Sequence, residues 1–219
     1  MRPTLYAHPF SSYCQKVLIA LYENNTAFNL RMLSPDDPAP AEELGKLWPL
    51  KRFPVLVDDG HTILEASIII EHLGLHHPGT VMLLPEDKKV ALDARMMDRV
   101  FDNYIMTPMQ KLVFNQTRAE GDRDAYGVAE ARSMLASAYG WLDRVMAKRT
   151  WAIGETFSLA DCAAAPSLFY SDWAHKIDKK HSNLRAYRSR LLARPSFARA
   201  VEEARPYRAF FPLGAPDRD

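Results

Sequence analysis

The chain has only two cysteines in 219 residues, Cys14 and Cys162. Two thiols so far apart form no disulfide framework, and their scarcity favours a reducing compartment. The N-terminal stretch MRPTLYAHPF lacks the apolar run of a signal peptide. Nothing in the sequence approaches the roughly 18–20 consecutive apolar residues that a membrane span needs. We therefore expect a soluble, cytoplasmic protein.

The chain also lacks an excess of charge, since 28 Lys and Arg face 27 Asp and Glu for a net charge of +1. This balance gives no general reason for binding nucleic acid or a membrane surface. Residues 176–208 are locally basic, but the charges follow a helical pattern and indicate a solvated face. No GxGxxG follows the first predicted strand and no P-loop occurs, so a nucleotide cofactor is not expected.

The first 78 residues alternate between strand and helix patterns. We predict a strand at 4–7, a helix at 12–23, a strand at 27–33 and a short helix ending near 47–50. A strand, an Asp59-Gly60 turn, a second strand and a helix follow between 53 and 73, and Asp-Gly is a strong hairpin signal. The order βαβ, α, ββα predicts an α/β domain with a mixed four-stranded sheet.

From residue 87 onward the pattern is helical throughout. Pro78, Gly79 and Pro85 mark a linker, which gives an N-terminal domain at 1–78, a linker at 79–86 and an all-helical domain at 87–219. We predict a long helix from 87 past 109 with a bend at Pro108, then helices at 122–148, from Ser158, at 184–192 and at 197–204. Ser158 and Asp161 form the pattern of a capping box, which fixes a helix start.

The segment SSYC, residues 11–14, opens the first predicted helix. A serine at a helix N-terminus usually caps the helix by accepting backbone N–H groups. Together with the partial positive charge of the helix end, its hydroxyl could instead stabilise a bound anion such as a thiolate. SSYC also has the spacing of CxxC with serine in the first position, which would leave Ser11 exposed and turn Cys14 inward.

Four motifs in this order resemble the cytosolic glutathione transferase family, whose fold is a thioredoxin-like domain followed by an all-helical domain. They are SSYCQKVLIALYE at the first helix, KRFPVLVDDG with a cis X–Pro bond, ILEASIIIEHL with a Glu at a helix start, and FSLADCAAAPSLF in the second domain. The first motif is also similar to that of maleylacetoacetate isomerases. The resemblance covers most of the chain and implies glutathione as co-substrate.

The resemblance implies a glutathione site made by Ser11, Arg52, Phe53, Pro54, Glu65, Ala66 and Ser67. Ser11 would donate a hydrogen bond to the glutathione sulfur and act as the catalytic residue. Arg52 would meet the glycine carboxylate, and the main chain at Phe53, before a cis Pro54, would pair with the cysteinyl backbone.

At the other end of glutathione, Glu65 would receive the γ-glutamyl amino group and the N–H of Ala66 would receive its carboxylate. Where the family commonly has serine after this glutamate, the chain has alanine, and only Ser67 could supply the missing hydroxyl. A hydrogen bond to a charged group contributes about 1.5–3 kcal/mol, so this position bears on the affinity for glutathione.

We expect the electrophile to bind between the two domains, against Phe10, Tyr13, Tyr104 and Met109. His72, His76 and His77 offer an H-x-x-x-H spacing on a helix, but no third ligand is evident and no metal is expected.

The resemblance therefore implies a homodimeric glutathione transferase of the detoxification type, which conjugates glutathione to small apolar electrophiles. A glutathione-dependent isomerase and a thiol–disulfide reductase that uses Cys14 as nucleophile remain alternatives. A non-catalytic ligand-binding or interaction protein with this fold is a third.

Overall fold

A computed structural model describes residues 2–219, and its N-terminal part has the predicted element order. The elements are β1 (Thr4–Ala7), α1 (Ser12–Glu23), β2 (Asn29–Met32), α2 (Ala39–Leu47), β3 (Val55–Asp58), β4 (His61–Ile63) and α3 (Ala66–His76). Helix α1 has the predicted bounds, because buried Val17, Leu18 and Leu21 give it a continuous apolar face.

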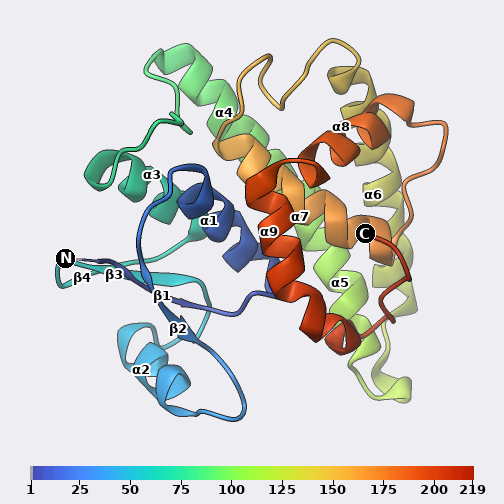
Figure 1. Ribbon diagram of the computed structural model, residues 1–219. Helices are drawn as coiled ribbons and strands as arrows, with labels where there is room; N and C mark the ends of the chain where they lie inside the picture. The colour runs from blue at the N-terminus through green and yellow to red at the C-terminus, as the bar shows by residue number, and fades with distance from the viewer. Residues whose placement is uncertain (1) are drawn as a thin grey trace.

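The four strands form one mixed sheet in the order β2-β1-β3-β4. Strand β1 runs parallel to β2 and antiparallel to β3, and β3 and β4 form a hairpin. The hairpin turns at Asp59 and Gly60, whose φ angles of 47° and 78° are both left-handed, as a two-residue turn requires. Helix α2 covers one face of the sheet, and α1 and α3 lie on the other (Figure 1).

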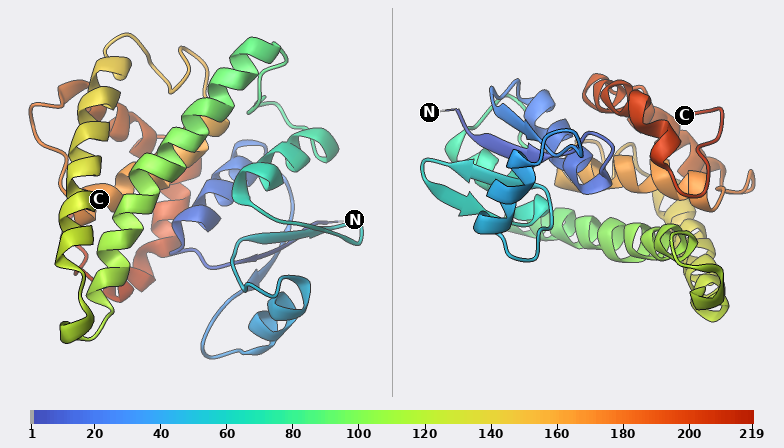
Figure 2. Two further views of the ribbon diagram at one scale, coloured as in Figure 1. Left: turned by 180° about the vertical axis from the view of Figure 1, so that it is seen from behind. Right: turned by 90° about the horizontal axis from the view of Figure 1, so that it is seen from below.

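The rest of the chain is helical. Its elements are α4 (Lys88–Val100), η1 (Phe101–Met106), α5 (Thr107–Gln116), η2 (Glu120–Asp122), α6 (Ala125–Met146), α7 (Leu159–Ala174), α8 (Ser182–Leu192), α9 (Pro195–Ala204) and η3 (Arg205–Phe210). Figure 2 shows α4, η1 and α5 as one long rod beside α6. None of the helices in residues 2–219 is both long and apolar enough to cross a bilayer.

Helix α7 lies at the centre of the molecule against α1, and its start is held by the predicted capping box. The Asp161 carboxylate is fully buried and accepts hydrogen bonds from the Ser158 N–H at 2.9 Å, the Ala152 N–H at 2.8 Å and the Tyr187 hydroxyl at 2.6 Å. Buried residues from both domains join in one hydrophobic core. The two domains are therefore packed together over a largely apolar interface.

The long rod is interrupted at η1, a six-residue π-helical segment. The N–H of Thr107 donates to the carbonyl of Asp102, and the Thr107 hydroxyl donates to the same oxygen at 3.0 Å. Pro108 has no N–H and cannot continue the α-helical ladder. The irregularity expected at Pro108 thus lies in the turn before it, and π segments of this kind are frequent at functional sites.

Candidate functional site

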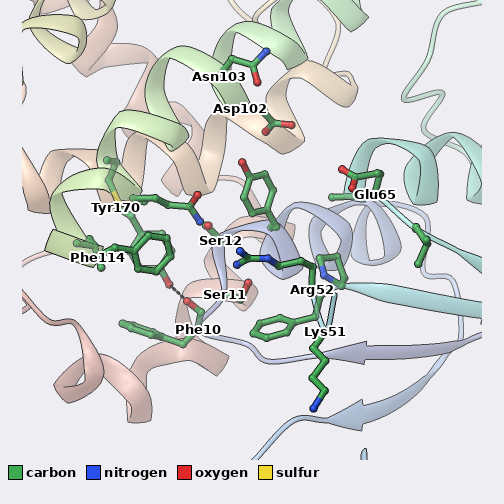
Figure 3. A pocket seen from close by; sticks show the side chains of 18 of the residues that line it. Phe10, Ser11, Ser12, Lys51, Arg52, Glu65, Asp102, Asn103, Phe114 and Tyr170 are labelled. Carbon is green, nitrogen blue, oxygen red and sulfur yellow. Dashed lines mark hydrogen bonds between the residues drawn. The ribbon is translucent and has the colours of Figure 1, made fainter. Parts of the chain in front are cut away.

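A cleft of about 670 Å³ opens between the two domains. The N-terminal domain contributes the start of α1, the loop before β3 and the start of α3, while α4, η1, α5, α7 and the C-terminal segment form the opposite side. Figure 3 shows Ser11 and Arg52 on one side of this space and Asp102 and Phe114 on the other. Its size is that of a site for a small molecule.

Ser11 caps α1 at the bottom of the cleft. Its backbone is extended, with φ of −82° and ψ of 125°, and its hydroxyl oxygen lies 3.5 Å from the N–H of Cys14. Because the Ser11 oxygen is the acceptor in this contact, the hydroxyl proton can still be donated into the cleft. Ser11 and the largely buried Ser12 both line the cleft. A group bound above them meets two hydroxyls and the positive end of a helix.

Cys14 is placed differently from a nucleophilic thiol. It is fully buried in the core, and burial raises the pKa of its thiol to about 12, although the Ser11 hydroxyl nearby acts in the opposite direction. At neutral pH the thiolate is then a negligible fraction, and nucleophilic chemistry needs the thiolate.

This burial predicts the outcome of thiol labelling. In the native protein, Cys14 and Cys162 should both resist an aromatic disulfide reagent, since both are buried and burial raises the pKa of each thiol. In 6 M guanidinium chloride both should react within minutes, giving two thiols per chain. Rapid labelling of one thiol in the native protein would restore Cys14 as a candidate nucleophile.

The loop before β3 brings cationic and backbone groups to the cleft. Lys51, Arg52, Phe53 and Pro54 all line it, and the Phe53–Pro54 peptide bond is cis, as predicted. Within residues 2–219, neither Lys51 nor Arg52 forms an ion pair. Arg52 is therefore available to an anionic ligand, whereas the Lys51 side chain runs away from Arg52 in Figure 3 and packs against Gly45 of α2.

At the start of α3, Glu65 and Ala66 also line the cleft. Glu65 precedes the helix with a φ of 67°, an uncommon backbone conformation for a residue with a side chain. Such outliers persist where the surrounding structure holds them and often mark binding sites. In Figure 3 the Glu65 carboxylate lies on the opposite side of the cleft from Tyr170.

Ser67 does not take the predicted place beside Ala66. Its hydroxyl points away from the cleft, where it accepts a hydrogen bond from Lys16 Nζ at 2.9 Å and donates to Asp98 Oδ2 at 2.8 Å. It also contacts the Arg99 guanidinium. Because the helix turns by about 100° per residue, a side chain one position after Ala66 faces α4 and cannot replace the missing hydroxyl.

Ser67 belongs to a buried charge cluster formed by Lys16, Ser67, Asp98, Arg99 and Asp102. The Lys16 side chain is 1% exposed, and its Nζ lies 2.5 Å from Asp98 Oδ1 and 2.8 Å from Asp102 Oδ2. Arg99 pairs with the same two carboxylates at 2.6 Å each. Burial raises the pKa of Asp102, against the lowering effect of Lys16. The cluster ties α1, α3 and the rod together behind the cleft.

Of the four residues predicted to contact the electrophile, Phe10, Tyr13 and Met109 lie in the cleft. Burial, with the nearby Asp102 carboxylate, raises the pKa of Tyr13 to about 12, so its hydroxyl stays protonated at neutral pH. Tyr104 does not line the cleft and is 52% exposed. Arg99, Asp102 and Asn103 form the face of the rod that lines the cleft, and Tyr104, one position further round the helix, points to the outside.

Several lining residues carried no signal that we recognised in the sequence. They are Trp48, Leu64, Arg99, Asp102, Asn103, Gln110, Val113, Phe114, Tyr170, Phe210, Phe211 and Pro212. Tyr170 joins the two sides, since its hydroxyl donates to the carbonyl of Phe10 at 3.0 Å and accepts from Gln15 Nε2 at 3.1 Å. The aromatic pair Phe210-Phe211 before a proline, outside any helical pattern, was a signal that could have been used.

The histidines at the end of α3 have a structural partner. His72 Nε2 and His77 Nε2 lie 2.8 Å and 2.7 Å from the same Asp58 oxygen, and the His76 ring packs on His72. Their contacts lower the pKa of Asp58, against the effect of burial. Among residues 2–219, no cluster of three or more His, Cys, Asp or Glu side chains is arranged to hold a metal ion.

Comparison with known proteins gives a consistent result. The family model for the glutathione S-transferase N-terminal domain matches residues 5–80, and that for the C-terminal domain matches residues 125–190. Among curated proteins, maleylacetoacetate isomerase of Dictyostelium discoideum is 26% identical over 94% of this chain and 95% of its own. A stringent starvation protein A homolog of Coxiella burnetii is 24% identical, covering 92% of each chain.

Among solved structures, a glutathione S-transferase from Methylobacterium radiotolerans, crystallised in complex with glutathione sulfonate, has a TM-score of 0.80. It is 32% identical in sequence, and the match covers 92% of this chain and 95% of that one. The agreement includes both domains and their order. The protein described here therefore belongs to the glutathione S-transferase family.

Proposed function

We propose that the protein is an active transferase that binds glutathione, ionises its thiol and joins the sulfur to a small apolar electrophile. The observation that carries this proposal is the cleft itself. It presents a hydroxyl at a helix N-terminus (Ser11), the Arg52 guanidinium and the Glu65 carboxylate in one continuous space, and neither Arg52 nor Glu65 is ion-paired within residues 2–219.

These cleft residues are complementary in charge to the groups of the tripeptide glutathione. Glutathione carries two carboxylates, one ammonium group and one thiol, and complementary charges at fixed positions orient a ligand. Arg52 supports the glycine carboxylate, the main chain at Phe53 supports the cysteinyl backbone, and Glu65 supports the amino group.

Two steps test the proposal. The protein should be retained on immobilised glutathione and eluted by free glutathione, and it should then catalyse conjugation of 1-chloro-2,4-dinitrobenzene. Glu65→Gln should weaken glutathione binding about tenfold, because a charge-assisted hydrogen bond contributes about 1.5–3 kcal/mol. The matched control Glu120→Gln, on the surface in η2, should bind as the parent does. Failure of the parent protein to bind glutathione would overturn the proposal.

The Dictyostelium relative supports a second candidate, a glutathione-dependent cis–trans isomerase. In that reaction the sulfur adds to a double bond, the carbon–carbon bond rotates, and the sulfur leaves again, so the same thiolate site is needed. Isomerisation of maleylacetoacetate, followed by its ultraviolet absorbance, separates this activity from conjugation. A reductase based on Cys14 finds no support in a fully buried thiol.

We also propose a cytoplasmic homodimer with a detoxification role. The two unpaired, buried cysteines agree with a reducing compartment. Exposed apolar side chains on α3 and α4, among them Leu75, Leu92 and Met96, offer a surface for a second copy. Light scattering during gel filtration should give about twice the mass of one chain, 24.9 kDa.

A further inference from the structure

The charges on the helical side of the cleft neutralise each other. Among the residues that the structure describes, Arg99 is the cationic side chain that lines this side of the cleft. It forms ion pairs with Asp98 and Asp102. Lys16 pairs with the same carboxylates from behind, so two cations face two anions. Within residues 2–219, the helical side of the cleft therefore has no cationic side chain without an anionic partner that could bind a carboxylate of the electrophile. Arg52, which has no ion-pair partner within residues 2–219, lies on the other side, where the proposed function uses it for glutathione.

The polar groups that remain on the helical side are carboxamides. Gln110 lies on α5, half-buried, and Asn103 lies on η1 near the rim of the cleft beside Asp102 (Figure 3). Neither side chain is hydrogen-bonded to another residue in the range 2–219. A carboxamide offers both donors and an acceptor without a charge, which suits a nitro or carbonyl group better than a carboxylate.

The surrounding walls are aromatic. Eight aromatic residues line the cleft in the part of the chain that the structure describes: Phe10, Tyr13, Trp48, Phe53, Phe114, Tyr170, Phe210 and Phe211. The Phe10 and Tyr170 rings meet edge to face with centroids 5.4 Å apart, so part of this wall is already fixed by its own contacts. Flat apolar walls of this kind remove water from a bound molecule, which makes an unpaired charge on that molecule more costly.

From these three features we propose that the cleft selects an uncharged, planar electrophile that carries a polar acceptor group. Electrophiles that carry a carboxylate are disfavoured, and Gln110 is a specificity-determining residue. The inference rests on the proposed function and narrows it. It favours conjugation over isomerisation of dicarboxylic acids. In the reaction the glutathione sulfur forms a bond to a ring carbon, the carbon–chlorine bond breaks, and chloride leaves with its electron pair.

A matched pair of substrates tests this selectivity. Methyl 4-chloro-3,5-dinitrobenzoate is neutral, while 4-chloro-3,5-dinitrobenzoate carries a carboxylate at the same position. For each substrate, kcat/KM is divided by the rate constant of its uncatalysed reaction with glutathione. This ratio should be about 10–100-fold higher for the ester, the factor that corresponds to one charge-assisted interaction. Affinities of the two glutathione conjugates, measured by calorimetry, should differ in the same direction whether or not turnover is fast.

A charge placed on α5 should reverse this preference. Gln110→Arg supplies the missing cation, so the ratio of ester to acid should fall at least about tenfold. Gln116→Arg, on the exposed last turn of α5 and outside the cleft, is the matched control and should keep the parent ratio. Gln110→Leu should lower kcat/KM for the ester while leaving the KM for glutathione unchanged.

The outcomes separate the two proposals. Equal rates and equal conjugate affinities for acid and ester, with normal glutathione binding, overturn this inference and leave the proposed function intact. An unchanged ratio in Gln110→Arg, with the fold preserved by circular dichroism, overturns the role of Gln110. Failure of glutathione and of both conjugates to bind overturns the proposed function and this inference together.

Discussion

Replacing Ser11 by alanine is expected to raise the pKa of the bound glutathione thiol by about one to two pH units and to lower kcat at pH 6.5 by about 10–100-fold. A free thiol has a pKa near 8.5, so making the thiolate dominant at pH 7 needs a change of roughly 2.7 kcal/mol. A charge-assisted hydrogen bond supplies about 1.5–3 kcal/mol and the helix end about 0.3–1 kcal/mol. Without the hydroxyl, most of this stabilisation is lost.

The measurement is a titration of the thiolate absorbance at 240 nm in the enzyme–glutathione complex. Ser11 also caps α1, and an alanine there costs about 0.5–2 kcal/mol of stability, whereas glycine costs only a few tenths. Ser11→Gly therefore removes the hydroxyl while sparing the helix. Ser12→Ala is the comparison, since Ser12 lines the same cleft. If Ser12→Ala moves the titration and Ser11→Gly does not, the sulfur contact belongs to Ser12.

Replacing Lys16 by methionine is expected to destabilise the protein by about 3–5 kcal/mol, the usual cost of removing one partner of a buried ion pair. Methionine keeps the length of the side chain, but the carboxylates of Asp98 and Asp102 lose the cation that lies 2.5 Å and 2.8 Å from them. Arg99 alone then faces two buried anions. Urea unfolding, followed by circular dichroism, measures the change in the free energy of unfolding.

Lys111→Met is the matched control, because Lys111 pairs with Glu130 on the surface of the rod and exposed pairs add little stability. Its unfolding midpoint should match that of the parent. A triple change of Lys16, Asp98 and Asp102 to apolar residues should recover much of the lost stability, since an apolar core can replace a buried ion pair. A Lys16→Met protein as stable as the parent would show that the cluster is dispensable.

The sequence predicted the fold well because the signals for it are local. Strand and helix periods, the Asp59-Gly60 turn and the Ser158–Asp161 capping box each act within a few residues, and the structure contains all of them. The side of the cleft formed by the N-terminal domain was likewise predictable in part, since Ser11, Phe53, Pro54, Glu65 and Ala66, which line it, lie in short motifs close to strand and helix ends.

The helical side of the cleft could not be predicted as well, because it depends on contacts between distant segments. Tyr170 reaches Phe10 across 160 positions of the chain, and no local pattern indicates that contact. Ser67 and Tyr104 were misplaced for a related reason. Ser67 is held by Lys16 and Asp98 from other helices, and the direction of Tyr104 depends on which face of the rod packs against the N-terminal domain.

The π-helical turn also has a consequence for how this cleft can diversify. A π turn, bonded from residue i to i+5, holds one residue more than an α turn, so deleting one residue between Phe101 and Met106 would restore regular winding without rotating the helix beyond it. Met109, Gln110 and Phe114 would keep their places in the cleft. A one-codon deletion in this turn would thus change the side chains around Asp102 and Asn103 alone, leaving the remaining wall of the cavity in place.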